Sequence, residues 1–249
     1  MNIKYPKAEP FNFAGLDGQT LQNSKVVVLP VPYSSTTYWS PDTKFGPQAI
    51  IEASRHMELY DLELACDISA KLRIYTLDPL SPSKNSPLEM TQQVEDAVSQ
   101  ILKLKKFPFI SGGEHSITLG VVKAIQKKYP NVSVLDFDAH TDFRDEFEGT
   151  KFHHGTVMRR VYDLGIPITQ VGIRSISEEE VKFLKKHPKA SNIFYAPKVP
   201  TEQIISTLKE DVYISIDLDN FDPSFMPATG TPEPGGLTWE QVTGLIKEV

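Results

Sequence analysis

Seven short apolar runs alternate with longer amphipathic stretches along this chain. The runs are rich in β-branched residues and span 25–32, 72–77, 107–111, 132–138, 168–173, 192–196 and 212–219. Several are apolar on both alternating faces, which indicates parallel strands buried between two layers. Helix-like stretches lie between them at 87–104, 116–128, 177–186 and 201–209. This order predicts an α/β fold, a three-layer α/β/α domain around a mostly parallel sheet.

The composition excludes several classes of protein. With 26 basic and 32 acidic side chains, the net charge is −6, which argues against nucleic acid as a partner. The single cysteine, Cys66, excludes an internal disulfide framework and a Cys-rich zinc site, and we expect it to be a packing residue. The N-terminus lacks an apolar signal segment, and no stretch approaches the ~20 apolar residues of a membrane span. We therefore expect a cytoplasmic protein without a membrane partner.

Three of the predicted strands end in residues that suit a metal site. Ligands of open parallel sheets bind beyond the carboxyl ends of the strands. Run 107–111 is followed by GGEHS, run 132–138 leads into DAHTD, and the third segment reads SIDLDNFDP. The two aspartates and the histidine of DAHTD recur at a spacing of two, which places them on one side of an extended chain. The candidate ligands are His115, Asp138, His140, Asp142, Asp217 and Asp219.

Four carboxylates this close together would raise one another's pKa unless a cation lay between them. Taken singly, His115 fits a structural residue at a helix start, and DAHTD fits a hydrogen-bonded loop. Two divalent cations would balance the charge of the four aspartates. Oxygen-rich ligation with imidazole and without thiolate favours Mn²⁺ over Zn²⁺, while Co²⁺, Ni²⁺ and Fe²⁺ stay open. Two cations about 3.5–4 Å apart can lower the pKa of a shared water, which indicates a hydrolase.

The three motifs resemble those of the ureohydrolase (arginase/agmatinase) family, in the same order and at similar spacing, with agmatinase the closest form. The similarity extends from about Lys25 to the end of the chain. The resemblance implies an arginase-like fold and two Mn²⁺ ions per chain. By the same resemblance, Asp138 and Asp217 bridge both ions. His115 and Asp142 then complete one ligand set, and His140 and Asp219 complete the other.

The reaction implied by the resemblance is hydrolysis of a guanidinium group to urea and an amine. A small cationic guanidino substrate such as agmatine would give urea and putrescine. Two residues are implied to be catalytic: Asp142 orients the nucleophile, and His154 carries a proton to the leaving amine. We expect the neighbouring His153 to lie on the loop surface.

The substrate tail is less well specified by the sequence. Segment 143–160 resembles the agmatinase form, and its Glu148 is a candidate ligand for an amine, although a solvated loop explains it equally well. Arg159 and Arg160 leave an acid-tailed substrate possible. Gln241 is the second candidate substrate-binding residue, and it stands where family members carry a glutamate that binds the guanidinium. A neutral amide would hold a cation less strongly.

Three alternatives to an agmatinase stay open at this point. They are another ureohydrolase (guanidinobutyrase, arginase or formimidoylglutamase), a catalytically silent metal-binding paralogue, and a single-zinc deacetylase with an arginase-like core. A dinucleotide-binding domain has little support, because no Gly-x-Gly-x-x-Gly follows a predicted strand. The resemblance also implies a homo-oligomer, a trimer or hexamer. By the same resemblance, we expect residues 1–249 to form a single catalytic domain that lacks its C-terminal strand and helices.

Overall fold

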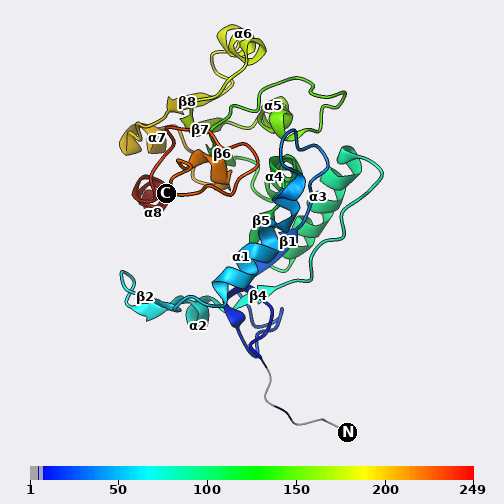
Figure 1. Ribbon diagram of the computed structural model, residues 1–249, viewed down its shortest axis with the longest axis vertical. Coiled ribbons are helices and arrows are strands. Elements are labelled where there is room, and N and C mark those ends of the chain that lie inside the picture. Colours follow the sequence, from blue (N-terminus) through cyan, green and yellow to red (C-terminus); the bar gives the residue numbers. More distant parts are fainter. Residues whose placement is uncertain (1–4, 6–7) are drawn as a thin grey trace.

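The computed structural model describes residue 5 and residues 8–249, and its seven longer strands form two parallel sheets (Figure 1). The first sheet has the order β4 (Ile74–Thr76), β1 (Val26–Val31), β5 (Phe107–Gly112). The second has the order β8 (Asn192–Tyr195), β7 (Ile168–Ile173), β6 (Ser133–Phe137), β9 (Val212–Ile216). All seven strands that the sequence predicted are present, but they do not form one continuous sheet.

In the part of the chain that the structure describes, eight helices connect and cover the strands. They are α1 (Gly46–Ser54), α2 (Ile68–Leu72), α3 (Pro87–Lys103), α4 (Thr118–Lys128), α5 (Val157–Asp163), α6 (Glu178–Lys186), α7 (Thr201–Ser206) and α8 (Trp239–Glu248). Local sequence sets their starts. Ser86 accepts a hydrogen bond from the Glu89 amide at the beginning of α3, and Ser177 with Glu180 forms a capping box at α6.

The alternation of side chains along β6 produces the three layers. Val134 packs toward α4 and α5, whereas Leu135 and Phe137 pack toward α7 and α8. A separate apolar cluster joins β1 to α3 and α4. Because β6 is apolar on both faces, it must be covered on both sides. This confirms the predicted three-layer α/β/α fold.

Strands β5 and β9 are both edge strands, and a cavity of about 1550 Å³ lies between them. Every residue of both strands lines this cavity. Phe107 on β5 is 66% exposed and Ile216 on β9 is 44% exposed. Within the described part of the chain, neither facing edge has a strand partner. The carboxyl ends of the two strands open into the same cavity.

A short hairpin, β2 (Tyr60–Asp61) and β3 (Cys66–Asp67), projects from the body of the molecule (Figure 1). Cys66, expected to be a packing residue, is only partly buried there. Among the described residues, no helix combines the length and the apolar character that crossing a bilayer requires.

Candidate metal centre

The carboxyl ends of β5, β6 and β9 meet at one end of the cavity. His115 begins the 3₁₀ turn η3 (His115–Ile117) just after β5, and Asp138 follows β6 directly. Asp219 lies in a second turn, η5 (Leu218–Asn220), after β9. The glycine at 113 is required by close packing, because a Cβ there would lie 1.9 Å from the carbonyl oxygen of Tyr33.

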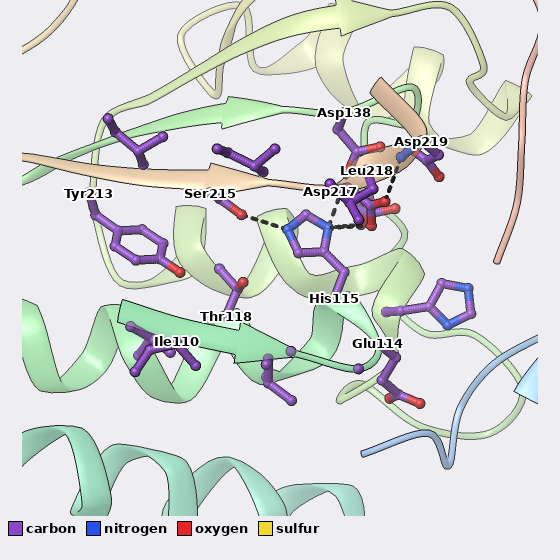
Figure 2. A pocket seen from close by; sticks show the side chains of 18 of the residues that line it. Ile110, Glu114, His115, Thr118, Asp138, Tyr213, Ser215, Asp217, Leu218 and Asp219 are labelled. Carbon is purple, nitrogen blue, oxygen red and sulfur yellow. Dashed lines mark hydrogen bonds and ion pairs between the residues drawn. The ribbon is translucent and has the colours of Figure 1, made fainter. Parts of the chain in front are cut away.

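The structure brings all six candidate ligands together. His115 Nδ1 lies 3.1 Å from Asp138 Oδ2, 3.1 Å from Asp142 Oδ2 and 3.7 Å from Asp217 Oδ2. Figure 2 shows the imidazole of His115 directed at the carboxylates of Asp138 and Asp217.

The second histidine approaches the same carboxylate from another side. His140 Nδ1 lies 3.1 Å from Asp219 Oδ2 and 3.5 Å from Asp138 Oδ1. The two oxygens of Asp138 therefore face different histidines, which is the arrangement that a ligand shared between two metal positions requires.

The donor atoms of this site fit divalent cations. Those of Asp138, His140 and Asp219 lie within 4.8 Å of one another, and so do those of His115, Asp136 and Asp138. Asp138 and Asp219 are 1% and 3% exposed. Within the described chain, the ion-pair partners of these aspartates are histidines, not Lys or Arg. Carboxylate and imidazole donors without thiolate suit Mn²⁺ or a similar ion.

The pKa values reflect how closely the carboxyl groups are packed here. Burial raises the pKa of Asp217, Asp142 and Asp219. The neighbouring Asp138 raises the pKa of Asp142 and Asp219 further. Burial by itself would lower the pKa of His140, but Asp138 and Asp219 raise it to about 12. The pKa of His115 is likewise raised well above 6.5, because Asp138 and Asp142 outweigh its burial. The protein thus leaves a negative charge that bound cations would neutralise.

Asp142 is held in place by its own loop. Its φ of 51° lies in the left-handed region, which few residues other than glycine adopt. Glu180 of α6 fixes the flanking residues, since its Oε1 accepts hydrogen bonds from Thr141 Oγ1 and the Phe143 amide, each at 2.8 Å. The same carboxylate closes the capping box of α6.

His154 lies on the wall of the cavity, at the start of the 3₁₀ turn η4 (His154–Thr156). Its amide donates to Thr36 Oγ1 at 3.1 Å, and its Nδ1 lies 3.5 Å from the same oxygen. The Thr36 hydroxyl in turn donates to Glu114 Oε1 at 2.6 Å. Burial lowers the pKa of His154. The imidazole is therefore neutral at neutral pH and able to take up a proton.

His153 is not on the loop surface, contrary to the expectation from the sequence. Its side chain is 1% exposed and its Nδ1 accepts a hydrogen bond from the Gly155 amide at 3.1 Å. Its ring also contacts that of His154 at a tilt of 38°, with 4.2 Å between the ring centroids. His153 is a buried N-cap of η4, because the turn that presents His154 needs an acceptor at that position.

The candidate substrate-binding residues occupy different places. Glu148 lines the cavity, with its carboxylate 3.6 Å from His153 Nε2. Gln241 does not line it. Its Oε1 accepts from the Thr238 amide and its Nε2 donates to Pro197 O at 2.8 Å, so the amide is used in capping α8. This geometry does not support the expected substrate-binding role of Gln241.

Arg159 and Arg160 also lie outside the cavity lining. Their guanidinium groups pair with Asp145 and Asp163, with an Arg160 Nη2–Asp145 Oδ1 distance of 2.6 Å. An acid-tailed substrate therefore finds no ligand in this pair.

Comparison with known proteins finds relatives over nearly the whole chain. The family model described as "Arginase family" matches residues 24–249. The N(1)-aminopropylagmatine ureohydrolase of Synechocystis sp. is 41% identical over 228 residues, 87% of this chain and 74% of that protein. The agmatinase of Pyrococcus horikoshii is 35% identical over 237 residues, 90% of this chain and 79% of that protein.

A solved structure agrees with these sequence relatives. The agmatine ureohydrolase of Thermoplasma volcanium has a TM-score of 0.86 at 32% identity, and the match covers 98% of this chain and 82% of that one. The fold, the three motifs and the relatives point to one conclusion: this chain belongs to the arginase family, as a ureohydrolase of the agmatinase type.

Proposed function

We propose that this chain hydrolyses the guanidinium group of agmatine to urea and putrescine, with two Mn²⁺ ions bound at the end of the cavity. The observation that carries the proposal is the position of Asp138 between two histidines, His115 and His140. A shared carboxylate flanked by two imidazole-containing ligand groups is the arrangement expected of a two-metal hydrolase.

We infer the ligand sets from the family resemblance. His115 with Asp142 would hold one ion and His140 with Asp219 the other, and the distance of 3.1 Å within each pair supports this division. Asp138 and Asp217 would be ligands of both ions, and Asp138 lies beside both histidines. When bound, the ions supply a water of lowered pKa and an electrostatic clamp on the reacting group.

The remaining chemistry falls to two side chains of this chain. Asp142 accepts a hydrogen bond from the attacking oxygen and orients it toward the guanidinium carbon. The leaving nitrogen needs two protons, one from the attacking hydroxyl and one released when water ionises. His154, neutral because burial lowers its pKa, takes up the second proton and delivers it to that nitrogen.

The cavity wall favours a substrate with an amine tail. Glu148 supplies a carboxylate there. Arg144, the arginine that lines the cavity, lies with its guanidinium 4.6 Å from the centroid of the Phe147 ring. N1-aminopropylagmatine is a second candidate substrate, because the Synechocystis relative at 41% identity carries that name. The two substrates share the guanidinium end and differ only in the length of the cationic tail.

Urea release by the Mn²⁺-loaded protein tests the proposal, with agmatine, N1-aminopropylagmatine, arginine and guanidinobutyrate compared at equal concentration. We expect the highest kcat/KM for one of the first two. His154→Asn should lower kcat by about 10²- to 10⁴-fold without loss of metal. The matched control is His187→Asn, at an exposed histidine, which should change neither kcat nor the metal content. Preference for arginine, or no turnover of any of the four compounds, would contradict the proposal.

We also propose that residues 1–249 act as a single catalytic domain. The cavity supports this proposal, because edge strands of both sheets, β5 and β9, line it along their full length. The candidate ligands at its end likewise follow strands of both sheets.

A homo-oligomer, a trimer or hexamer, is proposed on the exposed side chains of the β2–β3 hairpin. Leu62 and Leu64 there are 87% and 65% exposed, and apolar groups gathered on a projecting hairpin favour a subunit contact. Light scattering after size-exclusion chromatography measures the mass directly.

The low cysteine content suits the reducing cytoplasm, which is the location we propose.

A further inference from the structure

Asp136 is a buried carboxyl group that the proposed chemistry leaves unused. It lies in β6, between β7 and β9, and its side chain is 0% exposed. The alternating residues Val132 and Val134 are apolar and belong to the cluster with α4 and α5. An unpaired carboxylate at such a position destabilises the fold. Its presence therefore requires a compensating role.

The contacts of Asp136 are few. Its Oδ2 accepts one hydrogen bond, from Gln170 Nε2 at 3.0 Å. Its Oδ1 has no hydrogen-bond donor and lies 3.5 Å from His115 Nε2. Among the described residues no Lys or Arg forms an ion pair with it, so the imidazole of His115 is its nearest cationic partner.

The two nitrogens of His115 face opposite environments. Nδ1 lies 3.1 Å from the carboxylates of Asp138 and Asp142, where the proposed metal lies. Nε2 lies 2.8 Å from Ser215 Oγ and 3.5 Å from Asp136 Oδ1. Figure 2 shows Ser215 and Asp138 on opposite sides of the ring. A metal-binding Nδ1 must carry its lone pair, so the proton must sit on Nε2. A carboxylate beside Nε2 stabilises that tautomer and makes Nδ1 a stronger donor to the metal.

We propose that Asp136 is a positioning residue for the metal ligand His115. Its carboxyl group favours the tautomer of His115 that is protonated on Nε2, and it thereby strengthens metal binding at the position that His115 completes. This inference rests on the proposed two-metal centre. Gln170 supports the arrangement, because its buried amide holds Asp136 and also donates to the carbonyl oxygen of Thr141 at 3.1 Å. Asp136 is thereby tied to the loop that carries Asp142.

A purely structural role predicts different behaviour. A carboxylate kept for folding would stabilise the metal-free protein, and its loss would lower the melting temperature. A positioning role predicts instead that loss of the carboxylate weakens metal binding at one position only, the one that His115 completes. Asp136→Asn has nearly the same volume and keeps an acceptor, while it removes the charge. Metal affinity measured at each position therefore separates the two roles.

The experiment titrates metal-free protein with Mn²⁺, follows the electron paramagnetic resonance signal of the free ion, and measures the melting temperature of the metal-free state. Wild type should bind two ions. Asp136→Asn should lose about 10- to 100-fold in affinity at one position only. Asp136→Leu, which removes the acceptor as well, should lose more at the same position. Thr169→Val is the control, because it removes another buried polar group from the same sheet. Its metal affinities should match wild type.

Wild-type affinity at both positions in the two Asp136 variants would overturn the inference. So would a lower metal-free melting temperature with equal weakening at both positions. Fewer than two ions on wild type would contradict the proposed metal centre itself, independently of Asp136.

Discussion

His153 provides a test of how tertiary burial sets the stability of this fold at mildly acidic pH. Its imidazole is 1% exposed, and Nδ1 accepts a hydrogen bond from the Gly155 amide, so the neutral ring with its proton on Nε2 is the form that the structure accommodates. Burial, reinforced by the neighbouring His154, lowers the pKa of His153 from 6.5 to about 4. Protonation would remove the acceptor that begins η4.

The magnitude follows from the two pKa values. Between pH 6.5 and about 4 the unfolded chain binds a proton at this position and the folded chain does not. The free energy of unfolding therefore falls as the pH falls through that window. At about 1.4 kcal/mol for each pH unit, the loss from this group reaches about 3 kcal/mol near pH 4. Above pH 6.5 the group adds no dependence on pH.

His153→Asn separates this contribution from those of the other titratable groups. The Asn Oδ1 can replace Nδ1 as the acceptor for the Gly155 amide and does not titrate. Urea unfolding of metal-free protein at several pH values between 4.5 and 7.5 gives the free energy of unfolding for both proteins. The wild-type curve should fall more steeply than the variant curve, by about 2–3 kcal/mol over the window. His187→Asn, at an exposed histidine, should leave the wild-type slope unchanged. Parallel curves for wild type and His153→Asn would refute the reasoning.

Three further predictions concern the loop, the metal centre and the sheet edges. Thr36→Val removes the hydroxyl between Glu114 and His154, and we expect kcat to fall about tenfold with two ions still bound, as measured by urea release and elemental analysis. Because burial raises the pKa of Asp142 and Asp217, Mn²⁺ binding should release protons and weaken below neutral pH. Calorimetry in buffers of different ionisation enthalpy measures that release, and identical enthalpies would contradict it. Amides on the facing edges of β5 and β9 should exchange hydrogen faster than those of β6, which pairs on both sides.

The fold class was predictable because it depends on local pattern. The apolar runs that became β1, β6 and β7 are short and rich in β-branched residues, and in β6 both faces are apolar, so the chain needed helices on two sides. Separation into two sheets was not predictable. The pairing partners of β5 and β9 are set by contacts between residues that are far apart in the sequence. The residue pattern within a strand does not predict which strand will lie beside it.

The candidate ligands were predictable for a similar reason. His115 follows one predicted strand, and Asp138 and Asp217 stand at or near the ends of two others. The carboxyl ends of parallel strands meet at one edge of a sheet. Asp136 was overlooked, although a carboxylate within an apolar run is itself a signal. Gln241 was misjudged as a substrate ligand, because nothing local shows that Pro197 would take its amide hydrogen bond.

By itself, the sequence determined the order of strands and helices, the residues at their ends, and the family, because each depends on residues close together in the chain. Tertiary structure decided how those residues act. It turned the two oxygens of Asp138 toward different histidines, buried His153 while leaving His154 on the cavity wall, and placed Asp136 behind His115. Burial and the distances between charges set pKa values and metal affinity, and both arise only when distant segments pack together.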